Sequence, residues 1–203
     1  MDALLITDVQ NDFLPGGALP VPDGDQVIPV INAIQHKFDL VLATQDWHPR
    51  NHGSFAANHS NRAPGDVIEL NGILQVLWPV HCVQDTFGAD FSVNLHTEHF
   101  AKVFRKGTDP GIDSYSGFFD NAKKRSTGLA DYLRAGGVDR VFLCGLATDY
   151  CVKFSALDSA EAGFKTILIA DACRGVDLRA GDSATAIEAM RRAGAAIIDS
   201  AYL

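Results

Sequence analysis

The chain lacks the features that direct a protein to a membrane, to nucleic acid or into a disulfide scaffold. Its four cysteines are irregularly spaced in 203 residues, too few for a disulfide framework in a chain of this length. No apolar run approaches the roughly 18 residues that a membrane-spanning helix needs, and the acidic amino terminus does not resemble a secretory signal. The net charge is −8 without any long run of lysine or arginine, so a nucleic acid backbone would be repelled. We therefore expect a cytoplasmic protein with neither nucleic acid nor membrane partners.

Apolar segments of strand length alternate with helical patterns along the whole chain. Because 47% of the residues are hydrophobic, one substantial core can form, and we expect a single domain over residues 1–203. The patterns predict strands at 3–7, 40–44, 101–105, 141–146, 166–170 and 196–199, and helices at 27–38, about 127–136, 148–162 and 183–193. Strands that read as buried on both faces and alternate with helices predict an α/β three-layer sandwich with a central six-stranded parallel sheet.

One segment, at about 47–100, does not fit this alternation. It exceeds ordinary loop lengths and holds six of the seven histidines. We interpret it as an insertion that covers the functional site and binds a metal, with one short helix predicted over Ile68–Leu77. Three histidines are predicted to lie in solvent, namely His36, His96 and His99.

Chemically active side chains recur where the predicted strands end. Asp8 follows the first strand, Asp46 and His48 follow the second, Lys106 follows the third, and Cys151 opens the helix after the fourth. Each of these residues alone has an ordinary structural explanation, as a turn former or a solvated strand end. Ligands of open parallel sheets bind at the carboxyl ends of the strands. The shared position at that edge therefore favours a functional site.

Cys151 is the candidate nucleophile of this site. With Thr148 as the predicted N-cap, the thiol lies in the first turn of a helix, where free backbone N–H groups favour a thiolate and can bind an oxyanion. We expect the helix dipole and the Lys106 ammonium to lower the pKa of the thiol, and Asp8 to act as the base that takes its proton. The alternative is that Cys151 is a small core residue.

Asp46, His48 and His81 are the candidate metal ligands. Mixed carboxylate and imidazole ligation suits zinc, manganese or ferrous iron, and it leaves positions open for water or substrate. Ser54 and His52 are further possible ligands, either directly or through water, or they are only polar loop residues.

Five motifs occur in an order that resembles the nicotinamidases, which are cysteine amidohydrolases of the isochorismatase-like superfamily. The resemblance extends over essentially the whole chain and implies the superfamily's Rossmann-like topology. The motifs are Thr7–Phe13 (TDVQNDF), Gln45–Phe55 (QDWHPRNHGSF), Trp78–Cys82 (WPVHC), the loop Lys106–Phe118 that begins KG and ends DSYSGF, and Gly145–Val152 (GLATDYCV).

The resemblance implies hydrolysis of nicotinamide to nicotinate and ammonia through a covalent cysteine thioester, a reaction of NAD salvage and pyridine nucleotide biosynthesis. It also implies one divalent metal ion, most simply zinc, that orients the pyridine ring. The site residues that it implies are the catalytic Asp8, Lys106 and Cys151, an oxyanion site at the N–H groups of Ala147 and Cys151, a cis peptide before Ala147, the metal ligands Asp46, His48 and His81, and ring contacts from Phe13, Trp78 and Tyr115.

Other functions are compatible with parts of this pattern. A superfamily relative could act on a different small amide or on an enol ether, although an ether hydrolase needs neither the metal ligands nor the cysteine. A metallohydrolase with a purely structural Cys151, and a non-catalytic metal or redox module, are further alternatives. Metal identity, preference among nicotinamide and analogues such as pyrazinamide, and the choice between monomer and homo-oligomer stay open.

Overall fold

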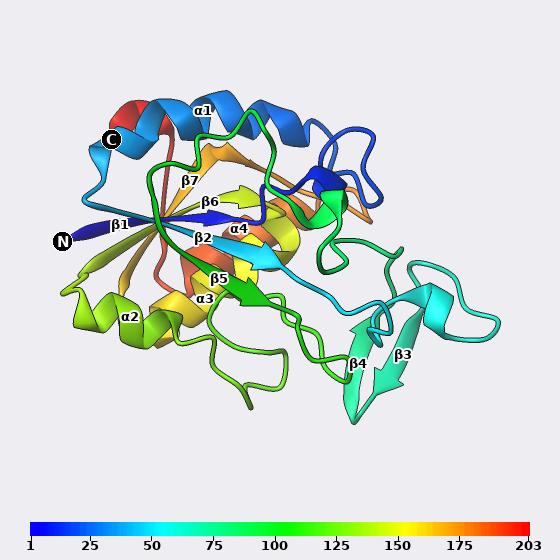
Figure 1. The fold of residues 1–203 in the computed structure, drawn as a ribbon. Coiled ribbons are helices and arrows are strands. Elements are labelled where there is room, and N and C mark those ends of the chain that lie inside the picture. Colours follow the sequence, from blue (N-terminus) through cyan, green and yellow to red (C-terminus); the bar gives the residue numbers. More distant parts are fainter.

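A twisted sheet of six parallel strands forms the centre of the molecule (Figure 1). The computed structural model describes residues 1–203. The strand order is β5-β2-β1-β6-β7-β8. The strands are β1 (Asp2–Thr7), β2 (Leu40–Asp46), β5 (Phe100–Lys106), β6 (Arg140–Leu146), β7 (Lys165–Arg174) and β8 (Ala196–Ile198). The predicted six-stranded parallel sheet is therefore confirmed, with β7 extending four residues beyond its predicted end.

Helices cover both faces of this sheet. Helix α1 lies on one face and α2 and α3 lie on the other, with α4 packed beside α3 (Figure 1). Their bounds are Val27–Ile34 for α1, Leu129–Ala135 for α2, Lys153–Glu161 for α3 and Asp182–Arg192 for α4. Even α4, with 11 residues, is too short for a bilayer, and none of the helices meets the length and apolarity that a crossing requires.

The central strands carry continuous apolar runs because both of their faces are covered. In β1, every residue from Ala3 to Ile6 is at most 1% exposed, so neighbouring side chains that point to opposite faces are all buried. Burial of this kind contributes roughly 25 cal/mol for each Å² of apolar surface removed from water. The sheet is therefore a rigid platform for the residues at its carboxyl edge.

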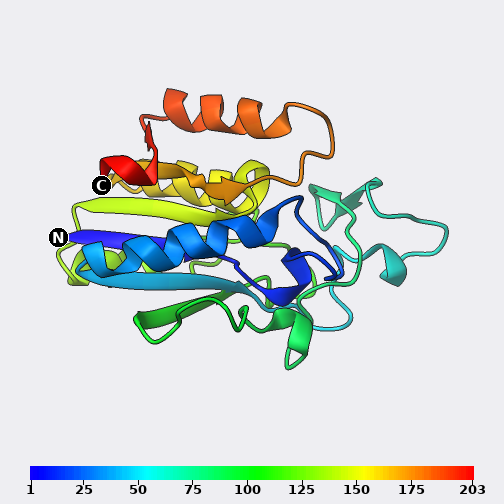
Figure 2. The same cartoon turned by 90° about the horizontal axis from the view of Figure 1, so that it is seen from above.

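The first part of the segment between β2 and β5 lies beyond the carboxyl ends of the strands (Figure 2), whereas its last residues return beside Asn32 of α1 to the start of β5. The helix predicted over Ile68–Leu77 is wrong. The residues form an antiparallel hairpin of β3 (Val67–Leu70) and β4 (Ile73–Val76). Asn71 and Gly72 connect the two strands with φ of 51° and 86°, the left-handed pair that a two-residue hairpin turn requires.

Gly145 allows β6 to lie close to β1 just before the site. Its φ is 109°, and a Cβ at this position would lie 2.1 Å from the Thr7 carbonyl oxygen. Gly163, at the end of α3, has a similar φ of 91° but no atom within 4 Å of the same position. A substitution by alanine at Gly163 would therefore cost only the free energy of the unfavourable φ, whereas at Gly145 it would also cost the free energy of a steric clash.

We expect Gly145→Ala to destabilise the protein much more than Gly163→Ala. The control should lose only the conformational cost, about 1–2 kcal/mol. The clash with Thr7 adds to this cost and should bring the loss at Gly145 above about 4 kcal/mol. Urea unfolding of both variants measures the difference. Equal losses would contradict the close approach of β1 and β6.

Candidate active site

The predicted catalytic and metal-binding residues meet at one edge of the sheet. β5, β2, β1 and β6 are consecutive neighbours, so the chain positions at their carboxyl ends are adjacent. Asp46 and Lys106 are direct partners in the register of β2 and β5. Asp8 follows β1 with a φ of 49°, and Cys151 lies in the first turn after β6. The predicted common location of these residues is confirmed.

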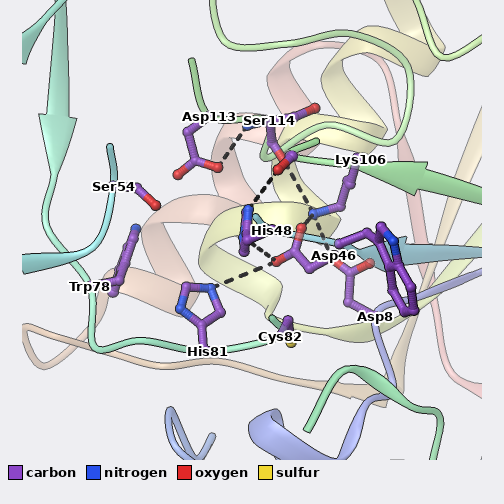
Figure 3. A network of polar contacts seen from close by, with 12 residues as sticks. Asp8, Asp46, His48, Ser54, Trp78, His81, Cys82, Lys106, Asp113 and Ser114 are labelled. Atoms are coloured by element: carbon purple, nitrogen blue, oxygen red, sulfur yellow. Dashed lines mark hydrogen bonds and ion pairs between the residues drawn. The ribbon is translucent and has the colours of Figure 1, made fainter. Parts of the chain in front are cut away.

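A single buried ammonium group links the two parts of the site. Lys106 is 2% exposed, and its Nζ lies 2.8 Å from Asp8 Oδ2 and 3.3 Å from Cys151 Sγ. The same Nζ donates to Asp46 Oδ1 and, at 3.1 Å, to the Ser114 carbonyl oxygen (Figure 3). Two carboxylates and a thiol are therefore arranged around one cation.

The two carboxyl groups around Lys106 have opposite pKa shifts. Burial raises the pKa of Asp8, and this effect outweighs the opposing effect of Lys106. Burial acts in the same direction on Asp46, but Lys106 and His48 together hold its pKa well below the usual range. Thr44 Oγ1 donates to Asp8 Oδ1 at 2.7 Å. Asp8 is thus the better proton acceptor, and Asp46 is a permanent anion.

Cys151 does not lie in the predicted environment of a first α-helical turn. Thr148–Val152 form a π-helical turn ahead of α3, and its N-cap residue is Ala147 without any side-chain cap, so the prediction of Thr148 as N-cap is wrong. Burial raises the pKa of the Cys151 thiol well above its usual value, and Asp8 and Asp46 offset the lowering effect of Lys106. The predicted lowering of this pKa is therefore also wrong: the resting nucleophile is a thiol that needs a base.

The Ala147 amide is a free hydrogen-bond donor beside this thiol. The peptide between Leu146 and Ala147 is cis. The Ala147 N–H has no acceptor within the protein, whereas its carbonyl oxygen accepts from Tyr150 and Val152. Ala147 and Cys151 both line the same pocket.

Asp46, His48 and His81 form a group that fits a divalent metal ion. Asp46 Oδ2 lies 3.6 Å from His48 Nε2 and 3.9 Å from His81 Nε2 (Figure 3). The Nδ1 atoms of the two rings lie 2.8 Å from the carbonyl oxygens of Gly107 and Pro79, respectively. This pattern places a proton on Nδ1 of each ring, so Nε2 is the nitrogen that faces Asp46 and that would bind a metal ion in its deprotonated form.

The other predicted histidines differ in their surroundings. His52 is buried, its ring centroid lies 4.3 Å from that of His48, and its Nδ1 lies 2.7 Å from Ser54 Oγ. His52 and Ser54 are thus hydrogen-bonded to each other and do not belong to the cluster of possible metal ligands around Asp46. His52 belongs to a second cluster of possible ligands, with His48 and Asp113. Burial lowers the pKa of His52 to about 4. The predicted exposure of three histidines is confirmed for His36, His96 and His99.

A pocket opens between the thiol and the histidines. The three aromatic residues predicted to contact the ring all line it, namely Phe13, Trp78 and Tyr115. Its other lining residues include Leu19, Asp113, Tyr150 and Val176, to which the motifs assigned no role. Tyr150 and Asp113 could have been inferred, since Tyr150 directly precedes Cys151 and Asp113 lies in the same motif as Tyr115. Leu19 and Val176 come from loops whose sequences carry no signal of this position.

Comparisons with known proteins are consistent over the whole chain. The isochorismatase domain model matches residues 2–202. The nicotinamidase of Escherichia coli (strain K12) is 48% identical over 201 residues, which cover 96% of this chain and 93% of that protein. The chain belongs to the isochorismatase family. The family resemblance inferred from the five motifs is thereby confirmed.

Solved structures of family members agree closely with this fold. An Acinetobacter baumanii nicotinamidase/pyrazinamidase has a TM-score of 0.96 and 46% identity, with 99% of this chain and 97% of that chain covered. A pyrazinamidase of Pyrococcus horikoshii in complex with zinc has a TM-score of 0.79 and 41% identity, with 98% of both chains covered.

We expect Lys106→Met to destabilise the protein because it leaves Asp8 and Asp46 buried without a cation. Removing one partner of a buried ion pair costs about 3–5 kcal/mol. Lys102→Met, at an exposed position of the same strand, is the matched control and should lose less than about 1 kcal/mol. Urea unfolding at neutral pH compares the two.

The loss at Lys106 should shrink as the pH falls. In the variant, the folded-state pKa values of the carboxyl groups lie above the unfolded value near 3.8, as burial already causes for Asp8 in the presence of Lys106. The folded state then binds more protons than the unfolded state, so its relative stability increases as the pH falls through the raised values. A loss that is independent of pH would contradict this electrostatic explanation.

Proposed function

We propose that this protein hydrolyses nicotinamide to nicotinate and ammonia through a cysteine thioester. The observation that carries the proposal is the position of Lys106 Nζ, in contact with Cys151, Asp8 and Asp46 at once. This contact brings a nucleophile, its base and the metal-binding group together at one site. The relatives named as nicotinamidases, with identity over nearly the whole chain, support the substrate.

The acylation half of the reaction follows from the polar contacts of the site. Asp8, whose pKa is raised by burial, takes the proton of the Cys151 thiol as Sγ attacks the carboxamide carbon. Lys106 stabilises the developing thiolate, and the N–H groups of Ala147 and Cys151 bind the oxyanion. When the C–N bond breaks, Asp8 returns the proton to the nitrogen, and ammonia leaves a thioester behind.

The deacylation half uses the same carboxylate a second time. Asp8 takes a proton from water as the water oxygen attacks the thioester carbon. The C–S bond then breaks, Sγ recovers the proton from Asp8, and nicotinate is released. The residues return to their starting protonation states, so the cycle is balanced with one water consumed.

We infer that Asp46, His48 and His81 hold one divalent ion, most simply zinc, and that Phe13, Trp78 and Tyr115 contact the substrate ring. The Nδ1 contacts of both histidines with backbone carbonyl oxygens, which leave Nε2 toward Asp46, and the lowered pKa of Asp46 support this ligand set. Such an ion would supply a Lewis acid able to bind the ring nitrogen of the substrate. The zinc complex of the Pyrococcus relative supports the identity of the metal.

We also propose one domain over residues 1–203, with residues 47–100 as its metal-binding insertion. The insertion connects two neighbouring strands of the sheet, and a hairpin is its only regular strand pair. A cytoplasmic location fits the four cysteines, all of which are buried and free. In that compartment the activity would serve NAD salvage, with a small molecule as the only partner that the proposal requires.

Cys151→Ala should abolish ammonia release from nicotinamide, by at least about a thousandfold, because no other group can form the acyl intermediate. Its metal content should stay unchanged. Cys144→Ala, which removes a buried thiol in the middle of β6, is the control and should keep most of the activity. A coupled ammonia assay and metal analysis measure both. Turnover that persists in Cys151→Ala would refute covalent catalysis.

Asp46→Ala should lose the bound ion, because two imidazoles alone hold a divalent metal weakly. Metal analysis after dialysis should show stoichiometry falling from one ion per chain toward zero, with a higher KM for nicotinamide. His96→Ala, an exposed histidine of the same insertion, should retain the metal. Full metal occupancy in Asp46→Ala would contradict the assignment of Asp46 as a ligand.

A further inference from the structure

Gln75 is the only buried residue of the β3–β4 hairpin. Its side chain is 2% exposed, whereas every other residue from Val67 to Val76 is exposed or half-buried. A buried amide costs free energy unless it is hydrogen-bonded, and an apolar residue would attach a hairpin equally well. The position of Gln75 therefore calls for an explanation in its hydrogen bonds.

The Gln75 amide donates to two side chains that line the pocket. Its Nε2 lies 3.0 Å from Asp113 Oδ2, 3.0 Å from the Tyr115 hydroxyl and 2.7 Å from the Val76 carbonyl oxygen, so its two N–H groups are shared among three acceptors. The same hydroxyl accepts a hydrogen bond from Trp78 Nε1 at 3.3 Å. One amide thus connects a loop carboxylate, a phenol and, through the phenol, an indole.

These three side chains form one part of the pocket wall, while Gln75 itself does not reach the pocket. Tyr115 has no other hydrogen bond that fixes its hydroxyl. The ring of Tyr115 also contacts the rings of Tyr150 and Phe154, with centroids 5.4 Å away in each case. These ring contacts have little direction, so the orientation of the hydroxyl group depends on its hydrogen bonds with Gln75 and Trp78.

We propose that Gln75 is a positioning residue for substrate recognition, which holds Tyr115 and Asp113 so that Tyr115 and Trp78 present a fixed surface to the substrate ring. The proposal rests on the proposed function for the identity of that ring, an aromatic carboxamide. It gives the hairpin a role in affinity for the substrate rather than in the chemical step, because Gln75 makes no hydrogen bond to Cys151, Asp8 or Lys106.

Gln75→Met tests this role, since methionine has a similar length and volume but no donor. We expect KM for nicotinamide to rise about tenfold, as the loss of one or two orienting hydrogen bonds predicts, with kcat within about threefold of the wild type. Metal content should be unchanged. Leu74→Ala, on the exposed face of the same strand, is the control and should leave both constants unaltered.

The emission of Trp78 gives a readout that does not depend on turnover. The chain has two tryptophans, so a Trp47→Phe background leaves Trp78 as the only one. In that background, Gln75→Met should make Trp78 more accessible to acrylamide and weaken nicotinate binding about tenfold, measured by quenching. Tyr115→Phe should produce a similar weakening, and adding Gln75→Met to it should have little further effect.

Two results would overturn the positioning role. One is a Gln75→Met enzyme with unchanged KM and unchanged Trp78 accessibility. The other is a fall in kcat at constant KM, which would place Gln75 in the chemical step. Absence of ammonia release from nicotinamide by the wild type would instead refute the proposed function, while the accessibility of Trp78 would still decide whether Gln75 holds the wall.

Discussion

The site depends on one buried cation, Lys106, between two carboxylates. An ammonium in the protein interior is stable only when its charge is compensated, and Asp8 and Asp46 supply that compensation from the carboxyl ends of two neighbouring strands. The same contacts determine where Cys151 can lie, since its Sγ is a further partner of Lys106 Nζ at 3.3 Å. The contacts that balance the buried charge of Lys106 are therefore the same contacts that position the catalytic residues.

This arrangement also separates the two carboxylates by function. Asp46 faces Lys106 and two imidazoles, so its negative charge is stabilised and its pKa falls; Asp8 is enclosed more completely and its pKa rises. Two chemically identical groups thereby become a metal ligand and a proton carrier. The raised pKa of Cys151 is consistent with this division, because a protonated thiol makes the base Asp8 necessary.

Much of this could be predicted from the sequence because parallel sheets collect the residues after their strands at one edge. The positions of Asp8, Asp46 and Lys106 follow from counting residues to the end of each apolar run. The hairpin was missed for a local reason: its apolar residues can be aligned with a helical period, whereas Asn71-Gly72 was the decisive turn signal. The π-helical turn at Cys151 and the high pKa of its thiol depend on packing and on summed charges, which no sequence period encodes.

Residues at the ends of the strands and residues of the pocket wall are positioned in different ways. Residues at the strand ends are held by the backbone register of the sheet, so the pairing of Asp46 with Lys106 does not depend on the conformation of the loops. The wall of the pocket has no such register: Trp78 and Tyr115 come from separate loops, and only side-chain contacts relate them to each other. A buried polar residue such as Gln75 is suited to this task because its hydrogen bonds have direction, whereas an apolar contact would permit the two rings to slide. The catalytic residues are therefore positioned by the sheet and the residues that recognise the substrate by side-chain contacts, so the two sets can vary independently within one fold.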